Sequence, residues 1–278
     1  MGVKCFFDFI AGIKKIKSNW VLKNQSLGAI ITKKEEITMS LYEEYKKDEF
    51  LFEDMTAIVV IPHEPEKGAP LALKTEYWPA FPETEKLLLE KGFYLCYVKN
   101  KNRWGIDEDL DRKARFIDFV SQKYSTAAKC VPVGMSCGGL IAIDLAAKYP
   151  EKIACLYLDA PVTNFMSCPL GCGVGEPLAE NNDEILKALG MTISQLISYR
   201  EMPMDRIPAL IENRIPLALV AGDSDRVVPY CENGIHLEKA YEKTSIPFKL
   251  WIKPGCDHHP HGATDPSEVV DFILANMR

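Results

Sequence analysis

The sequence predicts an α/β fold with a mostly parallel sheet that is covered by helices on both faces. Two observations carry this prediction. From residue 56 to the C-terminus, short apolar runs rich in β-branched residues alternate with longer segments of helical periodicity. One such run, at 130–133, passes through Gly-Met-Ser-Cys-Gly directly into an apolar segment of helical length. Regular alternation is typical of strands that are joined by crossover helices and lie parallel in one sheet.

The individual elements follow from the apolar pattern and from the positions of glycine and proline. Residues 56–62 form a continuous β-branched run that stops at Pro62, which indicates a strand buried on both faces. The segment 81–91 is helical and ends at Gly92, a residue suited to a helix C-cap. The same reasoning predicts strands at 93–98, 130–133, 153–158, 216–221 and 248–253, and helices at 107–123, after Gly138, around 236–243 and at 266–277.

The alternation breaks between residues 164 and 214. An interval of this length is not expected to be a structureless loop inside a compact domain. It contains a loop rich in cysteine and glycine, followed by helical pieces near 183–189 and 192–199. We therefore predict that 164–214 is a small helical cap inserted into one domain that covers 1–278.

The first fifty residues are less informative. Residues 1–10 predict a helix or an extension that packs on the domain, because Asp8 interrupts their apolar patch. They lack the small-residue cleavage site of a secretory signal and the Ser or Thr of a myristoylation pattern. The runs at 30–32 and 37–41 predict short antiparallel strands.

Composition and charge exclude several classes of function. The 278 residues are 47% hydrophobic and 26% charged, the usual proportions of a soluble globular protein. A net charge of −6 argues against nucleic acid or an anionic membrane as the main partner, and no apolar run reaches the length of a membrane span. We expect a cytoplasmic protein whose partner is a small molecule, and homo-oligomer formation is compatible with the sequence.

Nine cysteines also favour a reducing compartment. Cys96, Cys130 and Cys155 fall inside apolar strand-like runs, where cysteine behaves as a small hydrophobic residue. An odd and scattered set does not predict a disulfide framework. Cys168 and Cys172 are near enough in sequence to be redox partners or metal ligands, but no second pair accompanies them.

The Gly-x-Ser-x-Gly sequence at 134–138 predicts a nucleophile, Ser136. A serine nucleophile must stand in a sharp strand-to-helix turn with its hydroxyl exposed, and flanking glycines avoid collisions in such a turn. The following helix points its N-terminal N–H groups at the same place, which favours negative charge. A plain turn between a strand and a helix has the same sequence, so further residues are needed to decide.

A serine nucleophile needs a base, and the base needs an acid that orients it. Such residues are expected in loops at the carboxyl ends of the strands. The loop after 216–221 contains Asp223 and Asp225, and the loop after 248–253 contains three histidines, His258, His259 and His261. Asp159, at the end of its own strand, is another candidate for the acid.

The order Ser, Asp, His, each one loop past a strand, resembles the α/β-hydrolase superfamily. In that superfamily the acid is typically the Asp of Gly-x-x-Asp-x-x-Val-Pro, which here implies Asp225, and the base ends a Gly-x-x-His turn, which here implies His258. Asp-Ala-Pro-Val at 159–162, Val-Pro-x-x-Glu-Asn at 228–233 and the Gly-x-x-His-His-Pro-His loop are similar to a group of poorly characterised bacterial α/β hydrolases. This narrower resemblance implies no particular substrate.

The resemblance also implies an oxyanion hole. One donor is the backbone N–H of Cys137, the residue after the nucleophile. Many relatives place His-Gly after the strand at 56–62 to supply the second donor, and this chain lacks that pair. We therefore expect the second donor from the longer loop that follows, at Leu73 or Lys74.

The histidine loop can also be interpreted as a metal site. Three histidines within four residues of one loop seldom converge on one ion, because zinc sites usually draw ligands from more than one segment. We therefore expect no metal and no cofactor, and we assign His259 and His261 to the pocket wall or to rival roles as the base.

The predicted activity is serine hydrolysis of a carboxylic ester through an acyl-enzyme, with the cap methionines Met166, Met191, Met202 and Met204 shaping an apolar acyl pocket. Peptidase and thioesterase activities use the same triad and stay open, since fold does not determine substrate. A non-catalytic binding protein of the same fold, or a transferase or lyase with the same triad, are the alternatives from other classes.

Overall fold

A computed structural model describes residues 42–277, and residues 1–41 and 278 lie outside the described part. The chain divides into two units, Met1–Glu44 and Tyr45–Arg278, and the fold below belongs to the second unit. The helix or extension predicted at 1–10 and the strands predicted at 30–32 and 37–41 lie outside the described residues. A single domain over 1–278 therefore stays a prediction.

The described unit is built on an eight-stranded sheet with the order β1-β2-β4-β3-β5-β6-β7-β8. The strands β4, β3, β5, β6, β7 and β8 run parallel to one another, whereas β2 is antiparallel to both β1 and β4. The prediction of a mostly parallel sheet is confirmed. The strands are β1 (Lys46–Phe52), β2 (Met55–Ile61), β3 (Leu71–Lys74), β4 (Tyr94–Val98), β5 (Cys130–Met135), β6 (Leu156–Asp159), β7 (Leu217–Gly222) and β8 (Phe248–Lys253).

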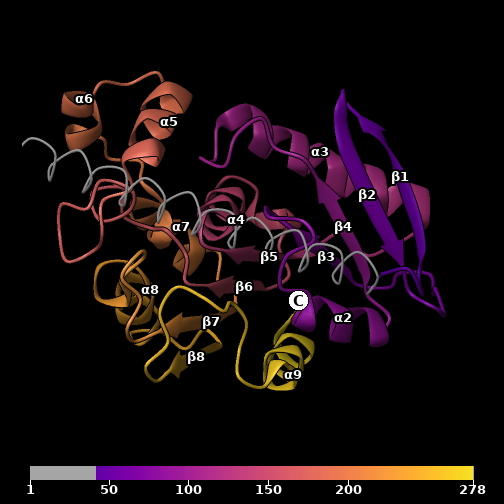
Figure 1. Cartoon of the computed structure of the whole chain (residues 1–278). Coiled ribbons are helices and arrows are strands. Elements are labelled where there is room, and N and C mark those ends of the chain that lie inside the picture. Colours follow the sequence, from indigo (N-terminus) through magenta and orange to yellow (C-terminus); the bar gives the residue numbers. More distant parts are fainter. Residues whose placement is uncertain (1–41, 278) are drawn as a thin grey trace, which may run out of the picture. The chain divides into compact units, whose positions relative to one another are not determined.

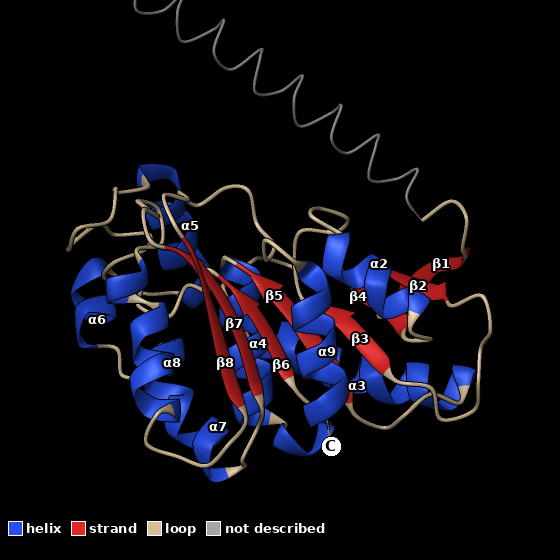
Figure 2. Cartoon of the chain, turned by 90° about the horizontal axis from the view of Figure 1, so that it is seen from below, coloured by secondary structure: helices blue, strands red, loops and turns tan. Residues whose placement is uncertain are grey.

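Helices cover both faces of this sheet. Figure 1 shows α2 and α9 side by side on one face, with α3 and α4 on the other. Figure 2 gives the same arrangement from below, with the strands crossing between the two layers. The helices are α2 (Glu83–Glu90), α3 (Asp107–Tyr124), α4 (Cys137–Lys148), α5 (Ala179–Leu189), α6 (Ile193–Ser198), α7 (Ile207–Glu212), α8 (Gly234–Tyr241) and α9 (Pro266–Asn276), with 3₁₀ turns η1 (Pro150–Lys152), η2 (Pro203–Arg206) and η3 (Tyr230–Glu232).

Strand β3 was not expected from the sequence. It has four residues and follows Gly68-Ala69-Pro70, so no apolar run of ordinary strand length marks it. Its register with β4 on one side and β5 on the other places it in the middle of the sheet, where all four of its residues are buried. Two neighbouring ladders, rather than local propensity, stabilise this short strand.

The interval predicted as a cap contains helices α5 to α7. Helix α6 begins at Thr192, whose hydroxyl accepts a hydrogen bond from the N–H of Gln195 while the side chain of Gln195 accepts from the N–H of Thr192. Helix α7 packs against α4 and α8, so the end of the interval belongs to the layer that covers the sheet. None of the helices between residues 42 and 277 is long and apolar enough to span a membrane.

Helix α4 lies beneath the other helices on its face and is buried almost throughout, which explains its apolar sequence. Asp144 is the exception in its middle, with 6% of its surface exposed. Burial raises the pKa of this carboxyl to about 8, although the guanidinium of Arg206, whose Nε lies 3.4 Å from Oδ1, lowers it. The folded protein therefore holds a proton on Asp144 that the unfolded chain releases near pH 3.8.

We expect Asp144→Asn to stabilise the protein increasingly as the pH rises. Because the folded-state pKa lies above the unfolded value, the contribution of Asp144 to wild-type stability is greatest below pH 3.8 and falls until about pH 8, whereas asparagine does not titrate. Between pH 5 and pH 8 the difference in unfolding free energy between variant and wild type should grow by about 2 kcal/mol. This is less than the limit of about 1.4 kcal/mol for each pH unit, because the surroundings of the carboxyl relax. Urea unfolding at the two pH values measures this change, with Asp118→Asn on α3 as the matched control because Asp118 is exposed and pairs with Lys152. Parallel stability profiles for wild type and Asp144→Asn would contradict the assignment.

Candidate active site

Ser136 stands at the turn between β5 and α4, as a nucleophile elbow requires. Its backbone has φ of 53°, a left-handed conformation that is uncommon for a side chain other than glycine. The N–H of Ser136 donates to the carbonyl oxygen of Asp159 at 2.9 Å, which holds the turn against β6. A Cβ at Gly134 would lie 2.4 Å from the carbonyl oxygen of Gly138, so the close approach of strand and helix requires glycine there.

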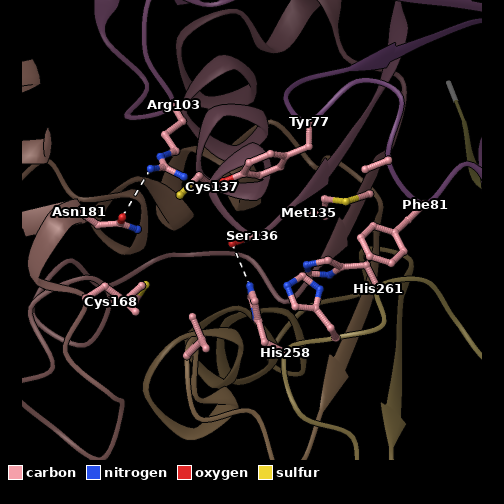
Figure 3. A pocket seen from close by; sticks show the side chains of 14 residues that line it. Tyr77, Phe81, Arg103, Met135, Ser136, Cys137, Cys168, Asn181, His258 and His261 are labelled. Carbon is pink, nitrogen blue, oxygen red and sulfur yellow. Dashed lines mark hydrogen bonds between the residues drawn. The ribbon is translucent and has the colours of Figure 1, made fainter. Parts of the chain in front are cut away.

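The structure brings Ser136, His258 and Asp225 into one hydrogen-bonded chain. The hydroxyl of Ser136 lies 3.1 Å from Nε2 of His258, and Nδ1 of His258 lies 2.8 Å from Oδ2 of Asp225. Figure 3 shows Ser136 and His258 facing each other across the pocket. The other oxygen of Asp225 accepts hydrogen bonds from the N–H groups of Val227 and Val228 at 2.9 and 2.7 Å. These contacts fix the carboxylate where it can orient the imidazole.

The environment of Asp225 keeps its carboxyl ionised. Burial acts to raise the pKa, since only 7% of the residue is exposed. The hydrogen bond and charge of His258, together with the two backbone N–H groups, outweigh burial, so the pKa is lower than usual. An ionised acid holds Nδ1–H of His258 and leaves Nε2 as the acceptor for the serine proton.

The rival acids have other contacts. Asp223 is exposed, and its Oδ1 accepts hydrogen bonds from the N–H of Gly255 at 2.7 Å and from the hydroxyl of Ser224 at 2.9 Å. It thus braces the loops after β7 and β8. Asp159 accepts a hydrogen bond from the N–H of Gly262 and faces His261, with Oδ1 3.4 Å from Nδ1. Neither of these contacts involves His258.

The rival bases also lie elsewhere. His259 is exposed and stacks on Phe81, with ring centroids 5.7 Å apart and planes 13° from parallel. His261 is 8% exposed, and burial lowers its pKa although Asp159 raises it. Both rings line the pocket beside His258, and neither stands between Ser136 and Asp225.

A pocket of about 280 Å³ opens over Ser136. Its apolar wall comes from several elements of the fold, and one end is polar. Arg103 and Asn181 form this polar end, and Figure 3 shows their side chains on the far side of the serine from the histidines. The apolar side chains that line the pocket are Ala80, Phe81, Met135, Leu178 and Val227. None of the four cap methionines predicted to shape an acyl pocket, Met166, Met191, Met202 and Met204, lines it.

Residues 97–277 match the prolyl oligopeptidase family of peptidases, and this span is more than half of the chain. The chain belongs to the prolyl oligopeptidase family. The predicted α/β-hydrolase fold is confirmed by this membership, while the narrower resemblance through the Gly-x-x-His-His-Pro-His loop stays a prediction.

Solved structures at low sequence identity share the fold of this prolyl oligopeptidase family member. Two structures of a puromycin hydrolase match with TM-scores of 0.64 and 0.62 at 16% and 17% identity, over 84% and 83% of this chain. Dipeptidyl peptidase 4 from Porphyromonas gingivalis matches with a TM-score of 0.61 at 16% identity, over 84% of this chain. The chain spans only 38% of the puromycin hydrolase and 35% of the dipeptidyl peptidase.

Family membership sharpens one of the predictions from the sequence. It makes the protein a member of a serine hydrolase family, as the Ser, Asp and His order indicated. It favours the peptidase alternative over the ester hydrolysis that we expected first. The triad could not separate the two activities, because acyl transfer to water is common to both.

The expected second oxyanion donor needs correction in this prolyl oligopeptidase family member. Leu73 and Lys74 lie inside β3 and pair in register with β4 and β5 on either side, so their backbone N–H groups belong to the sheet. Neither residue lines the pocket. The ammonium group of Lys74 is buried, donates to the carbonyl oxygen of Ala80 at 2.9 Å and forms an ion pair with Glu85. Lys74 therefore anchors the segment between β3 and α2.

Tyr77 replaces Leu73 and Lys74 as the residue of this segment that reaches the nucleophile. It lies three positions after β3, with φ of 60°, and it lines the pocket. Figure 3 shows its ring extending toward Cys137. Burial and the hydrogen bond to the Cys137 thiol raise the pKa of Tyr77, so its hydroxyl keeps its proton. The sequence carries no signal for this role beyond an aromatic residue after a short strand.

Arg103 is the second pocket residue that sequence reasoning missed. It comes from the loop between β4 and α3, and its Nε donates to both carboxylate oxygens of Glu184 at 3.2 Å. A further guanidinium nitrogen lies 3.4 Å from the side-chain oxygen of Asn181. Because Glu184 and Asn181 belong to α5, Arg103 joins the loop after β4 to α5 and lines one end of the pocket.

The cysteines of the site are unreactive or distant. Burial raises the pKa of the Cys137 thiol to about 11, although Tyr77 and Arg103 lower it, so this thiol stays protonated. Cys168 is buried and lines the pocket, whereas Cys172 is exposed, and both are free thiols. Among the described residues, the one group of three potential metal ligands consists of His258, His259 and His261. The three side chains converge, contrary to our expectation from their spacing.

Proposed function

We propose that this protein is a serine peptidase that cleaves the amide bond of short peptides or peptide-like amides. The observation that carries the proposal is the continuous chain from Ser136 through His258 to Asp225, at 3.1 and 2.8 Å, in a member of the prolyl oligopeptidase family. The fold-related proteins named puromycin hydrolase and dipeptidyl peptidase 4 support the choice of an amide over an ester.

The proposed mechanism assigns one step to each side chain. Ser136 attacks the carbonyl carbon while Nε2 of His258 takes its proton, and Asp225 stabilises the imidazolium that forms. His258 then returns the proton to the leaving amine, which is the step that amide cleavage needs most because an amine anion is a poor leaving group. Water attacks the acyl-enzyme by the same route and regenerates Ser136.

The pocket supports a short substrate. Its volume of about 280 Å³ accommodates one or two residues, and α5 from the cap closes the far end. The apolar wall fits an apolar side chain next to the scissile carbonyl. Arg103 lies partly buried at the polar end, where its guanidinium can donate to a backbone carbonyl of the substrate in addition to its bonds with Glu184.

A matched panel of substrates tests the proposal. We expect cleavage of di- and tripeptide anilides with an apolar residue before the scissile bond, and no cleavage by the Ser136→Ala variant. Each anilide is paired with the p-nitrophenyl ester of the same acyl group, because activated esters react with almost any serine nucleophile. If the esters were hydrolysed and no anilide were cleaved, the protein would be an esterase and the proposal would be wrong.

Tyr77→Phe is expected to lower kcat by about 10²–10³-fold with little change in KM. We assign the hydroxyl of Tyr77 as the second donor to the oxyanion, beside the N–H of Cys137, and a lost oxyanion donor costs this much because the bond is strongest in the transition state. Steady-state kinetics on the best anilide measure the effect. Tyr149→Phe is the control. The hydroxyl of Tyr149 donates a hydrogen bond to Asp111 at 2.7 Å, and neither residue lines the pocket. Wild-type kcat in Tyr77→Phe would place the second donor elsewhere.

A further inference from the structure

Three imidazole rings stand together at the mouth of the pocket, and we call His258, His259 and His261 the histidine triangle. Their ring centroids are 5.0 Å apart for His258 and His259, 4.8 Å for His258 and His261, and 5.0 Å for His259 and His261. The planes cross at 65°, 79° and 90°. One ring nitrogen from each histidine lies within 4.8 Å of the other two. One nitrogen from each of the three inclined rings thus lies at the edge of one small volume.

Two of the three rings are oriented by carboxylates. Nδ1 of His258 lies 2.8 Å from Asp225, and Nδ1 of His261 lies 3.4 Å from Asp159. A carboxylate beside Nδ1 favours the tautomer that carries its proton there, which leaves the lone pair on Nε2. Histidines that bind metals almost always have such a partner on the other ring nitrogen. Both carboxylates are buried, at 7% and 3% exposed, and the one on Asp225 is hydrogen-bonded to its histidine at 2.8 Å.

The third ring is positioned by an aromatic neighbour. Phe81 stacks on His259 with ring centroids 5.7 Å apart and meets the ring of His261 at 77° with centroids 5.3 Å apart. His259 is nevertheless exposed, unlike His258 and His261. The triangle therefore has two buried rings and one exposed ring, and an ion can enter from the solvent side beside His259.

We propose that the histidine triangle binds Zn²⁺ and that the bound ion inhibits the enzyme. Zinc takes imidazole nitrogens at about 2.0–2.1 Å, which puts two ligand nitrogens of a tetrahedral site about 3.4 Å apart. The ring nitrogens lie within 4.8 Å of one another, so they must approach by up to about 1.4 Å. Nε2 of His258 is the atom that receives the serine proton, and a zinc ion on that lone pair removes the base from Ser136. Inhibition rests on the proposed function of His258, whereas binding of the ion does not.

Binding is tested separately from catalysis, in the Ser136→Ala protein. Calorimetric titration with Zn²⁺ and visible absorption with Co²⁺ are expected to show one ion per chain in a tetrahedral nitrogen site. His259→Ala in the same background should weaken binding at least tenfold, and Asp159→Asn should weaken it about 10–100-fold through the orientation of His261. His236→Ala, which changes a histidine outside the triangle, is the matched control. No binding, or equal binding in His259→Ala, overturns the proposal.

Inhibition is tested in the active enzyme. We expect Zn²⁺ to inhibit hydrolysis of the best substrate, with recovery of activity on addition of EDTA. The half-inhibiting concentration should rise at least tenfold in His259→Ala, with each variant compared with its own rate without metal. An unchanged concentration means that zinc acts elsewhere, on a thiol for example, and overturns the proposal. Binding without hydrolysis of any substrate would instead refute the proposed function and leave the metal site intact.

Discussion

Replacing Ser136 with alanine is expected to lower kcat by about 10⁶-fold, the largest effect of any single change in this protein. The hydroxyl is the only group of the proposed triad that forms a bond to the substrate, so its loss removes the acyl-enzyme route altogether. Because alanine keeps the pocket and the N–H of Cys137, KM should change little. Steady-state kinetics with the best anilide, at enzyme concentrations high enough to detect the residual rate, measure the loss.

The control for this experiment is Ser194→Ala on α6, where the serine is exposed and lies outside the pocket. It should react at the wild-type rate. A fluorophosphonate probe adds a second measurement, since it labels a serine only where a base activates it. We expect labelling of wild type and of Ser194→Ala, and none of Ser136→Ala. Equal labelling of wild type and Ser136→Ala would remove Ser136 from the mechanism.

The same probe separates the enzyme from the other classes that the sequence left open. A non-catalytic binding protein of this fold would leave wild type unlabelled. A transferase or lyase would be labelled but would hydrolyse none of the anilides or esters of the panel. Labelling together with turnover is the result that the hydrogen-bonded chain from Ser136 to Asp225 leads us to expect.

The residues of the triad could be predicted because each has a local signal. Ser136, Asp225 and His258 each stand in the loop directly after an apolar strand. A parallel sheet brings the carboxyl ends of neighbouring strands to one edge, so loops that are far apart in sequence meet there. The topology of the sheet therefore explains why these three residues could be predicted. Strand order and a few turn residues were enough to bring three side chains together.

The missed residues lack a local signal of this kind. Strand β3 has four residues, so the segment after it could not be placed from the sequence, and the second oxyanion donor was assigned three or four positions before Tyr77. Arg103 lies in a loop, and its role depends on Glu184 and Asn181, some eighty residues later. Contacts of this range depend on how α5 packs against the loop after β4, which no apolar pattern specifies.

The convergence of the histidine triangle could not be predicted for a similar reason. Spacing alone shows that His258, His259 and His261 share a loop, but the direction of each ring depends on partners from other elements. Asp225 lies in the loop after β7, and Asp159 is the last residue of β6. Phe81 lies just before α2. The choice between ester and amide could not be made from the sequence for a different reason, since a triad performs the same acyl transfer on both.

Asp225→Asn is expected to lower kcat by about 10⁴-fold while leaving the fold and KM nearly unchanged. The side-chain amide is the same size as the carboxylate, but its NH₂ group cannot accept the proton of Nδ1. His258 then takes the opposite tautomer, with the proton on Nε2, and can no longer accept the serine proton. Kinetics on the best anilide measure the loss, and circular dichroism checks that the variant is folded.

Asp223→Asn is the matched control, because Asp223 stands two positions away and has the same chemistry but hydrogen-bonds Gly255 and Ser224 instead of His258. Its kcat should stay within about tenfold of wild type. The reverse result, a 10⁴-fold loss in Asp223→Asn with Asp225→Asn active, would assign the acid to Asp223. A similar, smaller decrease of kcat in both variants would mean that both carboxylates act on the loop that carries His258. Asp223 contacts this loop at Gly255, and Asp225 bonds the imidazole directly. The two variants therefore distinguish orientation of the base from placement of its loop.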